Sequence, residues 1–319
     1  MPIQYPGGRA TPRLELGVAV QEFIQTADEF VGTKIMPIFK TKKKAATFSA
    51  ITRDYITQDV DTKRSSRGNY NRIGVGAKDK SFNCAENGLE NPLGDDERAL
   101  YQTDFQAELV CSKVTARAVL QAQEKRIAAK IFNTTTFTGS ALYTDNTANP
   151  WATIATDIIG QVSTGKQKIR SNTGLLPNAL LMNYANFENC KKNTAILNRI
   201  QYNKVATDAE VAGYLAALFG VDNILIAKGI LNSAKEGQTF VSGDIWSSNF
   251  VLFGLIDPSG EDLSIPSVGR TFLWTEDSPD NALVEQYRDD TIRSDVFRVR
   301  QNTDENLIDP YFGHLMKVG

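Results

Sequence analysis

One string in the sequence has the spacing of a phosphate-binding loop. Gly160, Gly165 and Lys166 match the pattern G-x-x-x-x-G-K, but Gln167 stands where such a loop needs Ser or Thr to ligand magnesium. A working loop also follows a buried strand and begins a helix, whereas residues 156–170 have a helical pattern throughout and precede a strand. The string therefore indicates a piece of helix and no nucleotide site.

Histidine chemistry has one candidate, because His314 is the only histidine among the 319 residues. A Ser-His-Asp triad, a Cys-His pair or a multi-histidine metal site would need this residue, five positions from the C-terminus, folded back into a cleft. We expect an exposed or partly packed terminal side chain instead. The sequence thus predicts no catalytic residue and no enzyme.

The cysteines indicate packing rather than chemistry. Cys84, Cys111 and Cys190 are odd in number and form no C-x-x-C pair. They encode neither a disulfide framework nor a zinc site, and free cysteines are commonly buried as small apolar residues. No metal and no cofactor is predicted.

Charged residues are divided between two regions of the chain. Carboxylates cluster near the C-terminus, close to turns, where they are more often solvated or capping than catalytic. Basic residues gather between positions 42 and 72. This polarity predicts pairing between subunits. The candidate contact residues are Lys43, Lys44, Arg64, Arg67 and Arg72 on the basic side and Asp289, Asp290, Asp304 and Glu305 on the acidic side.

Composition places the chain among folded proteins. It is 41% hydrophobic and 23% charged, which excludes disorder and collagen. Its 35 basic and 37 acidic residues give a formal charge of −2, so no overall field drives it onto nucleic acid or an anionic membrane. No apolar run approaches the roughly 18 residues of a membrane span, and the N-terminus lacks a secretory signal pattern. We expect synthesis and retention in the cytosol.

The first hundred residues predict two segments that lack a core of their own. Residues 1–40 alternate turns with apolar pieces, and must gain burial from the rest of the chain or from a neighbouring subunit. Within them, residues 30–38 are expected to be extended, because Pro37 argues against a helix. Strand-like runs at 46–57 and 70–82 flank a polar middle and predict a long two-stranded projection lying on another surface.

A very long helix is predicted at about residues 95–132. This stretch has no Pro or Gly, and its apolar residues recur at helical steps. The helix would be roughly 55 Å long, which implies an elongated or flattened molecule. The apolar face comprises Tyr101, Phe105, Leu109, Ala116, Leu120, Ile127 and Ile131.

The remaining sequence mixes helices and strands, so the fold class is α+β. Helices are expected at 152–171, 184–198 and 208–219, the last ended by Gly220. Buried strands are expected at 179–182, 224–227 and 249–255, and antiparallel strands at 271–274, 282–288 and 290–300.

This order of parts resembles the major capsid proteins of tailed bacteriophages, the Hong Kong 97-type fold. The resemblance is carried by FVGTKIMPIFKTKKKAATF before the projection, by the helix from Asp95, by LLPNALLMNYANFENCKKNTAILNRIQY, and by RSDVFRVRQNTDENLIDPYFGHLMKV at the end. It implies an N-terminal arm at 1–40, an extended loop at 41–91, a peripheral domain at 92–171 and 268–319 with a spine helix at about 95–132, and an axial domain at 174–265.

The resemblance also implies a function. Such proteins assemble as hexamers and pentamers into icosahedral shells that enclose double-stranded DNA, often with scaffold, portal and decoration proteins. We therefore expect a virion protein that is assembled in the host cytoplasm and touches DNA weakly and non-specifically. Some relatives cross-link a loop lysine to an asparagine, which would involve Lys63 or Lys78 with Asn302 or Asn306. Two alternatives stay open: an encapsulin-like compartment that encloses an enzyme, and a soluble enzyme that uses carboxylates or Lys166.

Overall fold

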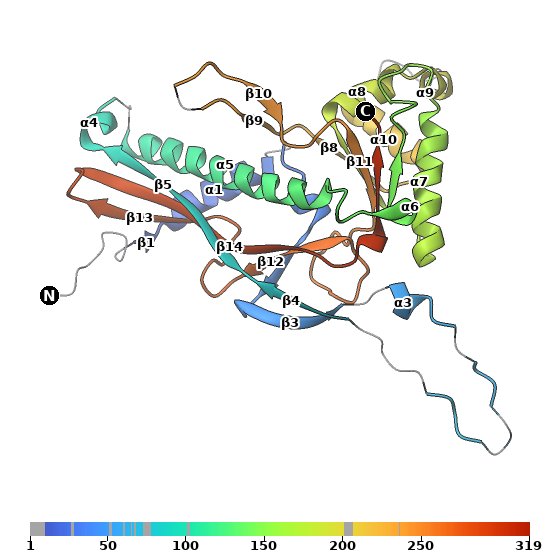
Figure 1. Cartoon of the computed structure of the whole chain (residues 1–319). Coiled ribbons are helices and arrows are strands. Elements are labelled where there is room, and N and C mark those ends of the chain that lie inside the picture. Colours follow the sequence, from blue (N-terminus) through green and yellow to red (C-terminus); the bar gives the residue numbers. More distant parts are fainter. Residues whose placement is uncertain are drawn as a thin grey trace.

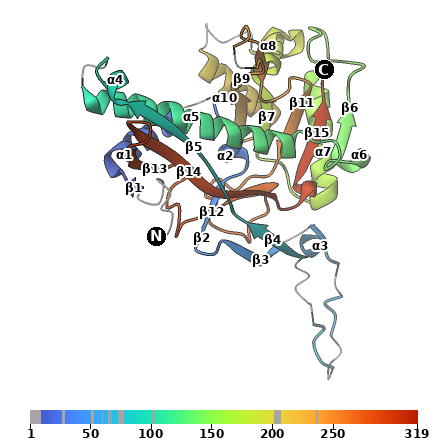
Figure 2. The same ribbon diagram turned by 60° about the vertical axis from the view of Figure 1, so that its left-hand side comes forward.

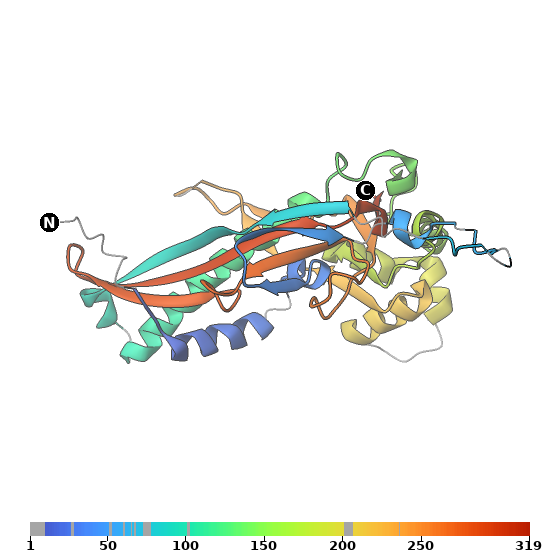
Figure 3. The same ribbon diagram turned by 90° about the horizontal axis from the view of Figure 1, so that it is seen from below.

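Two β-sheets and the helices on their faces form the body of the chain (Figure 1). The structure, a computed structural model, describes residues 10–26, 29–50, 53–59, 61–64, 66, 68–72, 78–100, 103–200, 207–235 and 237–319. The molecule is elongated in Figure 1 and flattened when it is seen from below in Figure 3. No helix in these ranges has both the length and the apolar character that crossing a membrane requires.

The six-stranded sheet is built around its longest strand, near the C-terminus. On one side this strand pairs with the strand that precedes the long helix, and on the other side with two strands in succession. Residues from both ends of the chain therefore share one sheet. Its strands are, in spatial order, β1 (Thr11–Pro12), β13 (Leu283–Asp289), β14 (Ser294–Leu307), β12 (Gly269–Trp274) and β2 (Ile38–Thr41), with β5 (Ala85–Gly94) along the other side of β14.

Side chains alternate along β14, as predicted for an antiparallel strand with one buried face. Phe297 and Val299 are buried among apolar residues of the helices, whereas Arg298 and Arg300 are only half-buried. Arg298 forms an ion pair with Glu90 of β5 at 2.7 Å. This face of β14 is therefore polar at Arg298 and Arg300.

The helix predicted at 95–132 is divided into two helices. α4 (Asp95–Arg98) is one turn, and α5 (Asp104–Ile131) begins after Thr103, whose hydroxyl accepts a hydrogen bond from the backbone N–H of Gln106. Thr is a favoured N-cap residue because its hydroxyl satisfies an otherwise unpaired N–H, and this explains the break. With 28 residues, α5 is about 42 Å long, shorter than expected.

The apolar face of α5 packs as predicted. α5 lies beside α1 (Leu14–Thr26) on one face of the six-stranded sheet (Figure 3). Tyr101 and the side chain of Phe105 lie outside the described part of the chain. Leu109 is half-buried, and the buried members of the predicted face are Ala116, Leu120, Ile127 and Ile131.

The N-terminal arm gains burial in one of the two expected ways and differs from expectation at one place. It contains α1, whose Leu16 and Val20 are fully buried in one apolar cluster with residues of α5, so the described part of the arm gains burial from its own chain. Residues 30–38 are not extended throughout, because α2 (Gly32–Ile35) forms one turn there. The prediction failed because a proline disfavours helix at its own position and the one before it, and α2 ends ahead of both.

The predicted projection is present, but its strands are shorter than expected. β3 (Ala45–Ala50) and β4 (Lys78–Asn83) pair antiparallel at its base, and α3 (Arg53–Ile56) follows β3. Residues 57–59 and 68–72 are not in strands, and residues 73–77 lie outside the described ranges. The segment extends well beyond the body of the molecule (Figures 1 and 2).

The five-stranded sheet is buried on both faces, which explains its continuous apolar sequence. Leu181 and Leu252 join a core that also contains residues of α5, whereas Leu180 and Phe253 join a second core on the other face. Its strands are, in spatial order, β6 (Tyr143–Asp145), β15 (Gly313–Lys317), β11 (Phe250–Gly254), β7 (Ala179–Asn183) and β8 (Asn223–Ala227).

Helices cover the second core, with one unexpected break. The helix predicted at 184–198 is interrupted at Asn193, which is buried and whose Oδ1 accepts from the backbone N–H of Ala195. Gly220 ends the last helix in the left-handed conformation, as predicted. The helices are α7 (Ile158–Thr173), α8 (Tyr184–Lys192), α9 (Thr194–Ile200) and α10 (Asp208–Phe219).

A second hairpin lies along α5 on the side away from the six-stranded sheet (Figure 1). The side chain of Gln121 donates a hydrogen bond to the carbonyl oxygen of Ile230 at 2.6 Å and ties the hairpin to α5. The hairpin comprises β9 (Ile230–Asn232) and β10 (Ser242–Asp244); the short helices near the five-stranded sheet are α6 (Gly139–Leu142) and the 3₁₀ turn η2 (Pro310–Phe312).

Candidate assembly surfaces

The base of the projecting loop is anchored by stacked aromatic rings. Phe82 of β4 lies flat on Phe272 of β12, with ring centroids 4.4 Å apart and an interplanar angle of 3°. Phe39 and Phe48 meet the same ring at 5.5 and 5.0 Å. Such pairs stabilise beyond the area they bury. The base of the loop is therefore part of the folded body.

Beyond its base, the part of the loop that the structure describes forms no core. The described residues from 57 to 72 are all exposed, except for Gly68, which is half-buried. Tyr70 is 74% exposed, and the guanidinium of Arg64 lies over its ring at 4.3 Å. This segment exposes a large aromatic side chain and has too few apolar residues to stabilise itself. Both features are typical of a surface that packs on another molecule.

The predicted basic residues are available for contact. Lys43 and Lys44 lie in the exposed turn between β2 and β3, and the ammonium of Lys44 lies 5.5 Å from the centroid of the Trp274 ring. Arg64 and Arg72 are exposed on the loop, whereas Arg67 lies outside the described residues. These four cations are therefore exposed at the surface of the subunit.

The predicted acidic residues separate into two groups. Asp289 and Asp290 lie at the turn between β13 and β14, at the opposite end of the molecule from the loop (Figure 1). Asp289 accepts hydrogen bonds from the backbone N–H and the hydroxyl of Thr291, while the side chain of Asp290 is 94% exposed. Because loop and turn are far apart within one subunit, any contact between them has to join two subunits.

Asp304 and Glu305, in contrast, are occupied within the chain. Asp304 accepts a hydrogen bond from the backbone N–H of Asn83 at 2.9 Å. Glu305 is 4% exposed and pairs with Arg126 of α5 at 2.9 Å. β14 turns Glu305 toward α5, so this carboxylate fixes the long helix on its own sheet and is not presented to a second subunit.

The residues expected for a cross-link are also partly committed. Lys78 pairs with Asp54 at 3.1 Å, and Asn302 is 1% exposed. Asn306 donates to the carbonyl oxygen of Ser81 at 2.9 Å. Lys63 is exposed. The expected cross-link would join two neighbouring copies, so it stays a prediction.

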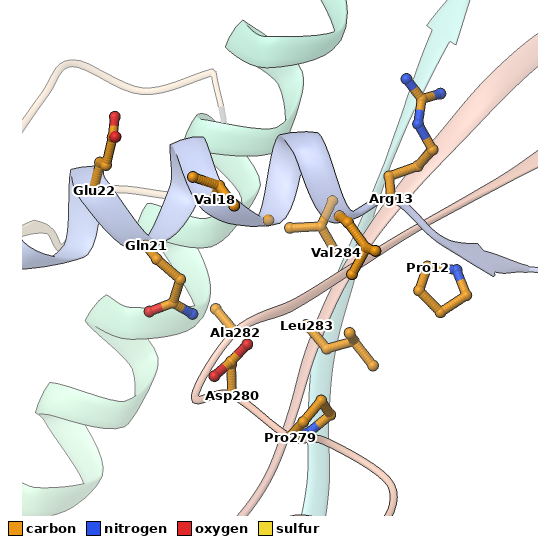
Figure 4. A pocket seen from close by; sticks show the side chains of 12 residues that line it. Pro12, Arg13, Val18, Gln21, Glu22, Pro279, Asp280, Ala282, Leu283 and Val284 are labelled. Carbon is orange, nitrogen blue, oxygen red and sulfur yellow. The ribbon is translucent and has the colours of Figure 1, made fainter.

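An apolar groove lies between α1 and β13 (Figure 4). It has a volume of about 510 Å³, with Val18 on the helix side and Leu283 and Val284 on the strand side. Leu14 and Val18 beside it are 80% and 61% exposed. The arm therefore buries one face in its own subunit and leaves a second apolar face open, as in chains that associate.

The nucleotide-like string lies within α7, as predicted. Its residues serve packing and capping: a side chain at Gly165 would come within 2.8 Å of the Phe253 ring, and Lys166 donates to backbone carbonyl oxygens at the end of α10.

His314 is buried, not exposed as expected, because it lies on β15 inside the five-stranded sheet. Its Nδ1 donates to the carbonyl oxygen of Ala141 at 3.2 Å, and its Nε2 accepts from the hydroxyl of Thr144 at 2.9 Å. Burial lowers the pKa of His314 to about 4. The ring is neutral and committed to two structural bonds.

The cysteines are buried, as predicted. Burial raises the pKa of Cys84 to about 11 and that of Cys190 to about 12, so neither presents a reactive thiolate at neutral pH. In the described ranges, no three His, Cys, Asp or Glu side chains are grouped so that they could hold a metal ion.

One residue of structural importance, Glu124, was not predicted from the sequence. It lies on α5 four positions after Leu120 and three before Ile127, on the apolar face, and it is 3% exposed. A carboxylate at this spacing is a signal of a buried polar contact, since unpaired buried charges are costly.

Comparisons with known proteins agree with this architecture. No protein-family model matches the chain. The chain is 23% identical over 280 residues to the major capsid protein of Burkholderia phage BcepMu, covering 86% of this chain and 88% of that protein. A phage-related protein from Bordetella bronchiseptica superposes with a TM-score of 0.75 at 18% identity, covering 97% of both chains.

A capsid structure supplies the third comparison. The capsid of cyanophage P-SCSP1u has a TM-score of 0.58 at 13% identity, over 89% of this chain and 86% of that chain. The similarities span nearly the whole chain, and together they confirm the resemblance to phage major capsid proteins that the sequence predicts. The chain has the α+β fold of tailed-phage capsid proteins, the Hong Kong 97-type fold.

Proposed function

We propose that this chain is the major capsid protein of a tailed bacteriophage, with a structural and not a catalytic role. Copies would join into hexamers and pentamers of an icosahedral shell that encloses double-stranded DNA. The observation that carries the proposal is the loop between β3 and β4, which is anchored in the body and extends beyond it, and whose described residues from 57 to 72 are exposed except for the half-buried Gly68. The capsid relatives support the same assignment.

The domain division is part of this proposal. The sequence suggests an arm at 1–40, a loop at 41–91, a peripheral domain at 92–171 and 268–319, and an axial domain at 174–265. The sheets divide the chain differently at three places. β5 pairs with β14 and so belongs to the six-stranded sheet. β6 and β15 belong to the five-stranded sheet, and α7 packs on that sheet. We propose the six-stranded sheet with α4 and α5 as the peripheral domain and the five-stranded sheet with α7 to α10 as the axial domain.

Contacts between subunits would combine the loop and the β13–β14 turn. The basic residues of the loop, Lys43, Lys44, Arg64, Arg67 and Arg72, would lie near Asp289 and Asp290 of a second copy. Such charge pairs set register and the rate of association more than affinity. Asp304 borders the loop base and would contribute to the same field, whereas Glu305 is internal.

Other partners follow from the proposed role. Scaffold, portal and decoration proteins would bind the assembling shell in the host cytoplasm, and the finished protein would reside in the virion. The formal charge of −2 supports weak, non-specific contact with packaged DNA, because a strongly basic inner wall would bind it tightly.

Electron microscopy of the purified full-length chain tests the proposal. Closed shells, or rings of five and six subunits, are expected. A chain that stays monomeric at high concentration, alone and with lysate of infected cells, would overturn it. The contents of recovered particles discriminate further: nuclease-protected DNA agrees with a phage shell, whereas an enclosed enzyme would indicate an encapsulin-like compartment.

A charge exchange tests the proposed contact. The double substitution Lys43→Glu with Lys44→Glu, and separately Asp289→Lys with Asp290→Lys, should each reduce shell yield by at least about tenfold, since like charges would then meet. Combining all four substitutions should restore much of the yield. Lys192→Glu with Lys228→Glu is the control for an equal change of charge. No recovery in the combined variant would contradict the pairing while leaving the shell assignment intact.

A further inference from the structure

Glu124 lies where three segments far apart in the sequence meet. Its Oε1 accepts hydrogen bonds from the indole Nε1 of Trp246 at 2.6 Å and from the backbone N–H of Val31 at 2.8 Å. Its Oε2 accepts from the backbone N–H of Gly32 at 2.7 Å. One carboxylate therefore joins the arm, the long helix α5 and the segment that leads into β11.

On the arm side, Glu124 takes the place of a helix cap. Val31 is the N-cap residue of α2 and makes no side-chain cap bond, so the first N–H groups of the turn are satisfied by the carboxylate of α5. The contact requires glycine: a Cβ at position 32 would lie 2.5 Å from Oε2 of Glu124 and 2.9 Å from Cδ1 of Ile127. Glycine at this position therefore lets the start of α2 lie close against Glu124 and Ile127 of α5.

On the other side, Trp246 continues the chain of bonds into the five-stranded sheet. Its ring is fully buried and meets Phe132 edge-on, with centroids 5.0 Å apart. Its carbonyl oxygen accepts from Nδ2 of Asn183 at 2.5 Å, and Oδ1 of Asn183 accepts from the backbone N–H of Ala185 at the start of α8. Hydrogen bonds thus run without interruption from the arm to the end of β7.

The charges around the carboxylate are few. Burial raises the pKa of Glu124, while its three N–H donors and the ammonium of Lys34 on α2 act in the opposite direction. A buried carboxylate is tolerated only while its donors stay in place, because a lost partner leaves a buried polar group unpaired. No donor can therefore move far without disturbing the others.

We propose that Glu124 is a latch that couples the arm to the five-stranded sheet: α2 can leave α5 only when the position of Trp246 changes as well. The coupling is a property of the single subunit. Its consequence in a shell rests on the proposed function, where a change in the tilt of the five-stranded sheet would release or tighten the arm.

Hydrogen exchange in the full-length protein tests the latch, with two tryptophan variants as a matched pair. Trp246→Phe removes the indole donor on the sheet side. It removes neither Glu124 nor the two N–H groups of the arm that bind it. Trp151→Phe is the control, since Trp151 is 1% exposed and donates to Gln161 at 2.8 Å without reaching α5. Each variant loses one hydrogen bond that the N–H of a buried indole donates.

The expected effect lies in the arm, far along the chain from the substituted tryptophan. Amide exchange in a peptide spanning residues 29–36 should rise by about tenfold in Trp246→Phe and stay at the wild-type rate in Trp151→Phe. Equal rates in both variants, whether raised or unchanged, would overturn the latch.

Glu124→Gln gives an independent check. The amide keeps the shape but offers one acceptor oxygen in place of two, so exchange of the Val31 and Gly32 amides should rise at least as much as in Trp246→Phe. Wild-type exchange in this variant would also overturn the proposal. Because the readout is taken on subunits, it is independent of whether shells form; a working latch in a chain that never assembles would reject the proposed function alone.

Discussion

The ammonium of Lys166 donates a hydrogen bond to the carbonyl oxygen of Gly220 at 2.9 Å. It also reaches the carbonyl oxygen of Phe219 at 2.5 Å, so a side chain of α7 neutralises the C-terminal end of α10. Gly165, its neighbour, lets α7 approach Phe253 of the sheet. The residues that resemble a phosphate loop are therefore explained by the packing of α7 against α10 and β11.

Removing this cap should lower stability without affecting anything else. Lys166→Met keeps the apolar stem and deletes the donor, and we expect the free energy of unfolding to fall by about 1 kcal/mol. Urea unfolding measures the loss. Gln167→Ala, at the exposed adjacent position, is the control and should unfold at the wild-type concentration. Equal midpoints for Lys166→Met and wild type would show that the cap contributes nothing.

The single histidine makes the pH dependence of stability separable. The folded-state pKa of His314 is about 4, below the value near 6.5 of an unfolded chain, so between these values the unfolded chain binds a proton that the folded chain does not. Stability from this group is therefore complete above about pH 6.5 and is lost as pH falls toward 4, roughly 2 kcal/mol by pH 5.

His314→Gln lacks this titration and should flatten the fall in unfolding free energy between pH 7 and pH 5. Thermal and urea unfolding at both pH values measure it. If the wild type and the variant lose stability equally, the imidazole is not buried in its neutral form.

Two leucines of α5 should respond differently to a charge. Leu120 is 6% exposed, so Leu120→Asp buries an unpaired carboxylate and should prevent folding. Leu109 is half-buried at the edge of its cluster, so Leu109→Asp should fold with a stability reduced by about 1–2 kcal/mol. Circular dichroism with thermal unfolding distinguishes them. Similar melting curves for the two variants would contradict the assignment of Leu120 to the buried face of α5 and of Leu109 to its edge.

The projecting loop should be dispensable for folding and required for assembly. Ala50 and Lys78 are register partners, so replacing residues 51–77 by Asn-Gly closes β3 and β4 with a two-residue turn. The ring stack at Phe82 and Phe272 is retained, and the melting temperature should shift by no more than a few degrees. Sedimentation and electron microscopy should show soluble subunits without shells. Shells of normal size from this variant would refute the role of the loop.

Much of the fold could be predicted because periodicity reports local burial. The apolar face of α5 at Leu120 and Ile127, the cap at Gly220 and the alternation around Phe297 follow from residue spacing alone. The break before Asp104 was missed because a threonine cap is one hydroxyl in a continuous helical pattern.

The exposure of the candidate contact residues was predicted less completely. Charge polarity located exposed cations such as Lys43 and Arg64. It could not separate Asp290, which faces solvent, from Glu305, which faces Arg126, because a carboxylate on a strand has the same sequence signature on either side of a sheet.

By itself the sequence determined which residue types are available for chemistry and which segments are short of apolar residues, since both depend on composition and on neighbours a few positions away. Only the tertiary structure decided what covers those segments. α1 is buried by residues about ninety positions along the chain, and Glu124 is satisfied by Val31 and Trp246 from either end. Contacts over such separations depend on how two sheets and a helix pack together, and local patterning carries no record of that packing.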